Sequence, residues 1–379
     1  MKNKIENIEK LRVCEFGQKS LYRVGGVEVV VYEIATRMVK LGIDVTCINR
    51  SGDQSFGYEG AQGKPKEIEG VKIKYAPTIN RKGFAAMTSS VFASFSAAFG
   101  NYNIVHVHAE GAAFMCWLPK LMGKKVIVTI HGLDHQRTKW GKLASWYIEI
   151  GERNATKYAD EIIVLSKGVR DYFKKTYGRE TNYIPNGVKK PTIREADIIT
   201  KRWGLSKASY VLLLSRLVPE KGVKYLIKAF KNIDTEIKLV IAGGSSDSNE
   251  FLNEIRALAA DDDRVILTGF VQAEVLDELY SNAYIYCLPS DLEGMPLSLL
   301  EAMSYGNCCL TSDIDECTEV VENKAFTFKK GDIEDLKEKL EFLISHEEEV
   351  TNHKVEASNY ICSKYSWDDV VEKTLRLYR

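Results

Sequence analysis

The sequence lacks the segments that carry a chain into or across a membrane. No stretch of its 379 residues reaches the roughly 18–20 apolar residues that a membrane-spanning helix needs. The N-terminal segment MKNKIENIEK is charged and lacks the apolar core of a signal peptide. These absences predict a soluble protein on the cytoplasmic side of the membrane.

Several motifs with well-understood chemistry are also missing. The eight cysteines are scattered without a CxxC pair, and most lie in apolar strand-like runs, which predicts buried thiols in a reducing cytosol. There is no GxGxxG fingerprint, no P-loop and no GxSxG elbow. Basic residues do not interleave with aromatic ones, which argues against nucleic acid as a partner. The aspartate run 261–263 resembles a metal site, but a solvated helix end is the better interpretation.

Charge is balanced overall but not along the chain. The whole sequence has 52 Lys+Arg and 52 Asp+Glu. Residues 1–185 have 28 Lys+Arg against 18 Asp+Glu, whereas the remainder has 24 Lys+Arg against 34 Asp+Glu. A basic first half is compatible with an anionic partner or a membrane surface. Two solvated surfaces of chance composition are an equally good explanation, because no polybasic run is present.

Strand-like apolar runs alternate with amphipathic helices, which is the pattern of a parallel α/β sheet. The expected strands are 11–17, 44–50, 71–77, 103–109, 125–132, 161–166, 181–187, 209–217, 237–244, 264–271, 283–290, 306–312 and 324–329. The expected helices are 26–41, 85–99, 111–122, 141–158, 168–176, 221–233, 249–260, 274–282, 296–305, 315–322 and 332–345.

This pattern predicts two Rossmann-like domains that face each other across a cleft. The first would span residues 1–187 and the second 209–347, with a linker at 188–208. A last segment, 348–379, reads as helical and is expected to cross back and pack on the first domain.

Ligands of open parallel sheets bind beyond the carboxyl ends of the strands, so the loops there are informative. Gly25 and Gly26 precede a helix whose first amides would face an anion, although a plain tight turn is the alternative. In SRLVPEKG (215–222), Arg216 and Lys221 follow a strand and could clamp a diphosphate. Two solvated loop cations would look the same.

The most informative stretch is SDLEGMPLSLLEAMSYG (290–306). Pro296 is expected in the first turn of a helix, and Glu301 lies further along it among apolar neighbours. A carboxylate there is costly unless it receives hydrogen bonds, which the hydroxyls of a sugar can donate. Glu293 precedes the helix and could meet another part of the same ligand, whereas a capping acid and an internal ion pair are the alternative.

Two further loops carry candidates. In TIHGLDHQRTKW (129–140), His131 ends a strand, and Asp134, His135 and Arg137 follow where they could meet an acceptor or be solvated. Gly269, in LTGFV (267–271), could allow a flat base to approach the backbone or could serve only as a turn.

Together these residues resemble the family-4 glycosyltransferases, which have the GT-B fold. SRLVPEKG is followed about 70 residues later by EGMPLSLLEAMSYG, and Glu293 and Glu301 match the E-x7-E motif of that family. HGLDHQR and IPNGV look like members that assemble bacterial capsule, exopolysaccharide or O-antigen. The resemblance implies a retaining transfer of a hexosyl or deoxyhexosyl group, without a cofactor or a metal, from a nucleotide-sugar.

The resemblance also implies roles for single residues. Arg216 and Lys221 would grip the diphosphate, and Glu301 would hold the ribose. The sugar would be held by Glu293 with the backbone of Gly294, Met295 and Pro296, and His131 would lie near the reacting carbon. The phosphate would be approached by Gly25 and Gly26, and the base would face Gly269, Phe270 and Val271. Relatives often have an aromatic residue where this chain has Met295, so the sugar does not transfer, and uridine is favoured over thymidine or guanosine only by family frequency.

The acceptor is expected to be a saccharide, free or linked to polyprenyl diphosphate. The uncharged run within 81–99 could form a helix on an anionic membrane surface, at the inner face of the plasma membrane, or pack within the first domain. A nucleotide-sugar epimerase, a phosphorylase of the same fold and an inactive nucleotide-sugar sensor are the rival functions.

Overall fold

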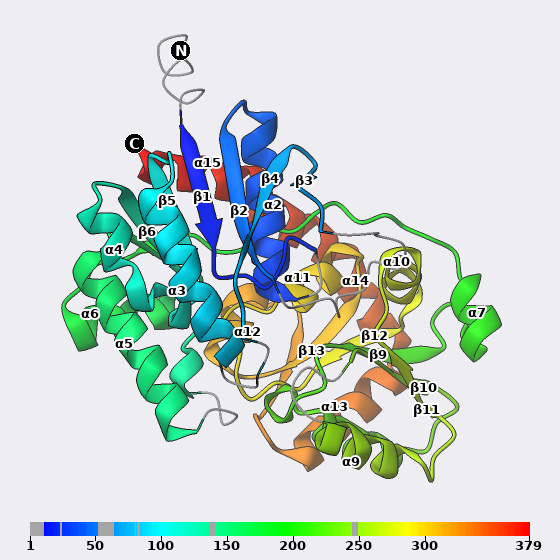
Figure 1. The fold of residues 1–379 in the computed structure, drawn as a ribbon. Coiled ribbons are helices and arrows are strands. Elements are labelled where there is room, and N and C mark those ends of the chain that lie inside the picture. The colour runs from blue at the N-terminus through cyan, green and yellow to red at the C-terminus, as the bar shows by residue number, and fades with distance from the viewer. Residues whose placement is uncertain are drawn as a thin grey trace. The chain divides into compact units, whose positions relative to one another are not determined.

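The computed structural model describes residues 11–22, 25–51, 64–79, 81, 84–136, 141–244 and 249–379. The chain forms two compact units, one of Met1–Asn186 with Trp367–Arg379 and the other of Gly187–Ser366. We call them unit 1 and unit 2. Each contains one sheet with helices packed against it (Figure 1). The prediction of two α/β domains with parallel sheets is confirmed.

The sheet of unit 1 has the strand order β3-β4-β2-β1-β5-β6-β7-β8 and is parallel except at β3. Its strands are β1 (Arg12–Phe16), β2 (Asp44–Arg50), β3 (Glu67–Ile68), β4 (Val71–Ala76), β5 (Ile104–His108), β6 (Lys125–Ile130), β7 (Glu161–Val164) and β8 (Asn182–Tyr183). The α-helices are α2 (Gly26–Lys40), α3 (Phe84–Phe99), α4 (Trp117–Leu121), α5 (Lys142–Tyr158), α6 (Lys167–Tyr177) and α15 (Trp367–Tyr378), with 3₁₀ turns at Gly111–Met115 and Asp134–Gln136.

Strand alternation gives the two faces of this sheet different characters. Odd-numbered β5 residues such as Val105 and Val107 join an apolar core with α3, α5 and α6. The even-numbered His106 points to the opposite face, where it contacts Tyr378 of α15. Polar side chains are therefore buried on the α15 side of the sheet.

The sheet of unit 2 is parallel throughout, with the order β11-β10-β9-β12-β13-β14. Its strands are β9 (Tyr210–Leu214), β10 (Lys238–Ala242), β11 (Val265–Gly269), β12 (Ile285–Leu288), β13 (Cys308–Ser312) and β14 (Phe326–Phe328). The helices are α7 (Ile198–Trp203), α8 (Val223–Lys231), α9 (Asn249–Ala259), α10 (Ala273–Asn282), α11 (Leu297–Ser304), α12 (Asp315–Val321), α13 (Ile333–Ser345) and α14 (Glu347–Lys364), with a 3₁₀ turn at Pro219–Lys221.

The C-terminal segment differs in part from its prediction. Residues 348–379 are helical as predicted and belong to two helices, of which only α15 belongs to unit 1. The longer α14 packs on α11 and β13 of unit 2, because its apolar residues, including Ile361, are buried there. The stretch 188–208 is likewise part of unit 2 and contains α7.

The predicted helix 111–122 is also interrupted. It begins as the 3₁₀ turn Gly111–Met115 and continues as α4 after Cys116. All eight cysteines are free, and all except the half-buried Cys362 are buried, as expected from their apolar surroundings.

Candidate active site

The strand order of unit 2 reverses between β9 and β12, and this switch point is where open α/β sheets bind ligands. The chain runs outward from β9 to β11 on one side and from β12 to β14 on the other. Arg216 and Lys221 follow β9, and Glu293 follows β12. Three of the residues predicted from sequence therefore lie on the two loops that border this point.

Two loops meet tightly there. Gly222 has φ of +64°, and a Cβ on it would lie 1.8 Å from the carbonyl oxygen of Pro289. The Lys221 ammonium forms an ion pair with Glu293 Oε1, 72 residues away in sequence. Ser290 Oγ donates to the same oxygen at 2.7 Å. The side chains of Lys221 and Glu293 are only 13% and 7% exposed, so this cation and carboxylate are held in fixed positions.

Helix α11 carries the second glutamate. Glu301 lies within the helix, half-buried, and its Oε2 accepts a hydrogen bond from Tyr280 Oη at 3.1 Å. A phenol from α10 thus supplies one of the hydrogen bonds that an acid among apolar residues requires. Pro296 is the N-cap rather than part of the first turn, and it has no N–H to donate. Gly294 and Met295 are buried beside it, the latter only 8% exposed.

The end of β11 contributes a third element to this edge of unit 2. Gly269 has φ of +72° and accepts a hydrogen bond from Gly243 N at 2.8 Å, which joins the ends of β10 and β11. Phe270 is 51% exposed, and Val271 is half-buried. An exposed aromatic ring beside an open glycine is a suitable surface for a flat base.

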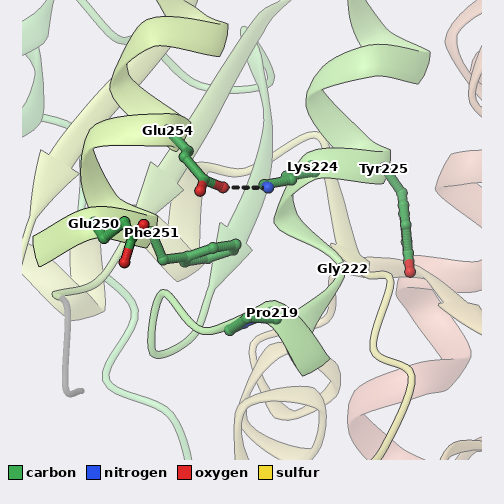
Figure 2. A pocket seen from close by; sticks show the side chains of 7 residues that line it. All are labelled: Pro219, Gly222, Lys224, Tyr225, Glu250, Phe251 and Glu254. Carbon is green, nitrogen blue, oxygen red and sulfur yellow. Dashed lines mark hydrogen bonds and ion pairs between the residues drawn. The ribbon is translucent and has the colours of Figure 1, made fainter. Parts of the chain in front are cut away.

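A pocket on α8 and α9 opens next to the loop of Lys221 (Figure 2). The side chains of Lys224 and Glu254 point toward each other and form an ion pair at its rim, and Phe251 lies nearby. Only Gly222 and Pro219 link this pocket to the SRLVPEKG loop, and none of the predicted site residues line it.

Unit 1 has its own switch point, between β1 and β5. His131 follows β6, and its Nε2 lies 3.1 Å from Nδ1 of His108 at the end of β5. Burial lowers the pKa of His131 to about 4, so its imidazole is neutral at pH 7. His131 is therefore suited to hydrogen bonding with a ligand and not to contributing positive charge.

The remaining predicted residues of unit 1 lie at the start of α2 and after β6. Gly25 precedes α2 in an extended conformation, and Glu28 Oε1 of the first turn accepts from Lys19 N at 3.0 Å. A site for an anion at Gly25 and Gly26 stays a prediction. Asp134 N donates to Glu110 Oε2 at 2.8 Å, whereas Arg137 lies outside the described residues.

Sequence reasoning missed a buried polar network behind His131. His106 Nδ1 lies 2.7 Å from Tyr378 Oη and His106 Nε2 lies 2.7 Å from Thr129 Oγ1, while Glu15 is fully buried nearby. Burial raises the pKa of Glu15 to about 8 and lowers that of His106 to about 3, which leaves both groups neutral at pH 7. The signal was the alternation HVH (106–108), which places two histidines on one face of a strand.

Two α/β units, each built on a mostly parallel sheet, are the architecture of the GT-B class of fold. The model for glycosyl transferases group 1 matches residues 196–372, and the model for Glycosyltransferase Family 4 matches residues 24–190. The chain belongs to the GT-B glycosyltransferases of this family-4 type. The recognition made from E-x7-E and SRLVPEKG is thereby confirmed.

Several characterised proteins are similar in sequence. The phosphatidylinositol N-acetylglucosaminyltransferase gpi3 subunit of Schizosaccharomyces pombe is 24% identical over 93% of this chain and 77% of its own length. The alpha-maltose-1-phosphate synthase of Mycolicibacterium smegmatis is 24% identical over 94% of this chain and 95% of its own length. The UDP-Gal:alpha-D-GlcNAc-diphosphoundecaprenol alpha-1,3-galactosyltransferase of Escherichia coli is 29% identical over 62% of this chain and 64% of its own length.

Solved structures agree on the fold. Sucrose-phosphate synthase from Thermosynechococcus elongatus superposes with a TM-score of 0.79 at 18% identity, covering 98% of both chains. Anabaena HepE in complex with UDP and glucose has a TM-score of 0.78 at 14% identity, covering 97% of this chain and 98% of its own.

Among the described residues, no helix is both long and apolar enough to cross a membrane.

Proposed function

We propose that this glycosyltransferase moves a hexosyl or deoxyhexosyl group from a nucleoside-diphosphate sugar to a saccharide acceptor with retention of anomeric configuration. The observation that carries the proposal is the arrangement at the β9–β12 switch point. There Arg216 and Lys221 follow β9 and Glu293 follows the neighbouring strand β12, and Lys221 is fixed by its ion pair with that carboxylate. Such a site offers positive charge for a diphosphate and an acceptor for sugar hydroxyls.

The chemistry follows from where charge develops. Breaking the bond between the anomeric carbon and the phosphate oxygen builds negative charge on the departing diphosphate. Arg216 and Lys221 would stabilise that charge, because fixed cations in a desolvated site need no reorganisation during the reaction. These two side chains supply the positive charge that a metal ion provides in other transferases, so we expect transfer without a metal.

The other predicted residues would orient the donor. Glu301, which accepts a hydrogen bond from Tyr280, would also accept hydrogen bonds from the ribose hydroxyls. Glu293 and the N–H groups of Gly294 and Met295 would hold the sugar, and the exposed Phe270 would face the base. Uridine is our preferred base, and HepE, which binds UDP and glucose, supports this choice.

Retention would proceed by attack from the face that the phosphate leaves, with the donor phosphate taking the proton of the acceptor hydroxyl. The neutral imidazole of His131 would hydrogen-bond the sugar near the anomeric carbon. This mechanism forms no bond between the enzyme and the sugar. A glycosyl-enzyme adduct trapped on a carboxylate and detected by mass spectrometry would contradict it.

The acceptor that we propose is a saccharide linked to polyprenyl diphosphate, in the assembly of a cell-surface polysaccharide at the inner face of the plasma membrane. Relatives from Escherichia coli and Campylobacter jejuni are named for transfer to diphospho-undecaprenol-linked sugars. Their similarity supports an acceptor of the same chemical class without specifying the linkage.

The proposal is tested by incubating the purified protein with UDP-, dTDP- and GDP-sugars, with and without lipid-linked saccharides, and measuring the nucleoside diphosphate released. We expect release from a UDP-sugar that rises strongly with acceptor, in buffer with a metal chelator. Conversion of the donor sugar without acceptor would favour an epimerase. Binding of the nucleotide-sugar with no turnover on any acceptor would favour a sensor.

Helix α3 supports contact with a membrane. Small residues such as Ala93 and Ala97 are buried, whereas its four phenylalanines face outward. The exposed ones are Phe84 (53%), Phe92 (46%), Phe95 (46%) and Phe99 (67%). Arg81 precedes the helix, and Lys124 Nζ reaches Gly100 O just after it at 2.9 Å. An apolar face with cations at both ends suits a surface of anionic lipid.

Vesicle flotation measures this contact. We expect the protein to float with vesicles that contain phosphatidylglycerol at low salt and to float less as salt rises, because salt screens the cations. Changing Phe92 and Phe95 to serine should abolish flotation, whereas changing the equally exposed Leu41, at the end of α2, should not. Absence of binding by the unmodified protein at low salt would end the proposal of membrane contact.

A further inference from the structure

Three ionisable side chains from separate segments of unit 1 converge behind the loop that follows β6. Glu110 follows β5, His135 lies in the 3₁₀ turn Asp134–Gln136, and Glu152 lies on α5. One nitrogen or oxygen atom of each lies within 4.8 Å of the others. The side chains of Glu110 and Glu152 are fully buried, and that of His135 is 16% exposed.

Each carboxylate has one oxygen held by a protein donor and one oxygen turned to the cluster. Glu152 Oε1 accepts from Tyr172 Oη at 2.9 Å and also from the Tyr177 hydroxyl. Glu110 Oε2 accepts from Asp134 N at 2.8 Å. Within the described part of the chain, Glu110 Oε1, Glu152 Oε2 and His135 Nδ1 are buried and make no hydrogen bond.

The backbone around the cluster is closely packed. A Cβ on Gly151 would lie 2.0 Å from the carbonyl oxygen of Glu110, so α5 lies directly against the chain that follows β5. Asn154 of the same helix donates to Phe114 O at 2.7 Å. The glutamates are therefore held at a fixed separation by the fold.

We propose that Glu110, His135 and Glu152 bind a zinc ion, with a fourth position open to water. His135 Nδ1 lies 3.4 Å from Glu152 Oε2 and 3.9 Å from Glu110 Oε1. Tetrahedral zinc with bonds of about 2.0–2.2 Å separates its ligands by about 3.3 Å, so small side-chain rotations complete the site. An imidazole with two carboxylates suits zinc better than magnesium or calcium, which prefer oxygen ligands alone.

Metal ligands are usually oriented by hydrogen bonds from surrounding groups. Here the hydroxyls of Tyr172 and Tyr177 and the backbone amide of Asp134 donate such hydrogen bonds to the two carboxylates. The ion would tie the segment after β6, which also carries His131, to α5 of the same unit. It would be structural, and the donor chemistry proposed above does not depend on it.

The other buried cluster, Glu15 with His106 and His108, is a weaker candidate. Both ring nitrogens of His106 already lie 2.7 Å from hydroxyl groups, so neither is available to an ion. The rival explanation for the first cluster is a proton instead of a metal, since the neighbouring carboxylates of Glu110 and Glu152, 3.9 and 3.4 Å away, favour the charged imidazole and raise the pKa of His135 to about 10.

Zinc titration of tag-free protein, stripped with a chelator, distinguishes these explanations. By calorimetry at pH 7 we expect one zinc ion per chain and a higher Tm with zinc than without. Glu110→Gln and His135→Phe should each weaken zinc binding more than tenfold, and Tyr172→Phe with Tyr177→Phe about tenfold. Glu149→Gln, on the exposed side of α5, and Glu15→Gln should bind zinc like the unmodified protein.

Circular dichroism and the Tm of the metal-free variants verify that each one folds. If Glu110→Gln did not fold, the His135→Phe titration would carry the test, because His135 lies at the edge of the cluster. The proposal is overturned if the unmodified protein binds no zinc, if the cluster variants bind it equally well, or if only Glu15→Gln loses it.

Discussion

Replacing Lys221 by alanine should lower the rate of sugar transfer by about 10²–10³-fold, the size of effect seen when one group that stabilises developing negative charge is removed. Lys221 is a largely buried cation, with a side chain 13% exposed, at the β9–β12 switch point, where the leaving diphosphate would lie. Glu293→Gln should have an effect of similar size, because that carboxylate both fixes Lys221 and would meet the sugar. The initial rate of nucleoside diphosphate release measures both.

A variant that fails to fold would also lose sugar transfer, so the folding of each variant must be measured separately. Removing one partner of a buried ion pair leaves the other charge uncompensated and costs about 3–5 kcal/mol. Tm must therefore be measured for both variants and for the double variant, which removes both charges. Lys224→Ala is the matched control, since Lys224 lies three residues on, pairs with Glu254 and is 41% exposed. We expect its rate to change less than about twofold, and equal rates for Lys221→Ala and Lys224→Ala would contradict the proposed role.

Gly222→Ala should destabilise unit 2 by about 3 kcal/mol and abolish donor binding. Its φ of +64° disfavours any side chain, at a cost of about 1 kcal/mol. The added Cβ would also lie 1.8 Å from the carbonyl oxygen of Pro289, which forces apart the two loops that carry Lys221 and Glu293. Thermal and denaturant unfolding measure the loss.

The variant Gly204→Ala separates the cost of a positive φ from the cost of the close contact with Pro289. Gly204 is in the same unit with φ of +60°, but the nearest atom to its added Cβ is the flexible Nζ of Lys238 at 3.6 Å. We expect a cost of only about 1 kcal/mol there and unchanged donor binding. If both variants lost equal stability, the close approach of the two loops would have no energetic importance.

Much of the architecture could be predicted because parallel strands are short buried runs separated by helices. The order of elements and the positions of Arg216, Lys221 and Glu293 at strand ends follow from that alternation. The path of the C-terminus followed only in part, because the sequence indicates helix throughout 348–379 but does not show that α14 packs on unit 2 while only α15 packs on unit 1.

Contacts between distant segments were beyond sequence reasoning. Nothing in the spacing of Lys221 and Glu293 says that they form an ion pair, since it depends on β9 and β12 being neighbours. Glu110 and Glu152 likewise look like ordinary surface acids in sequence, and only the packing of α5 on the chain after β5 brings them together. Periodicity predicts which face a residue occupies but not which residue lies opposite.

The central claim is that the β9–β12 switch point of unit 2 binds the diphosphate of the donor. Calorimetric titration of UDP and of UMP into the unmodified protein and into Arg216→Ala and Lys221→Ala tests it most directly. We expect UDP to bind at least tenfold more tightly than UMP, and each substitution to remove most of that preference while leaving UMP binding nearly unchanged. Equal preference for UDP in all three proteins would contradict the account.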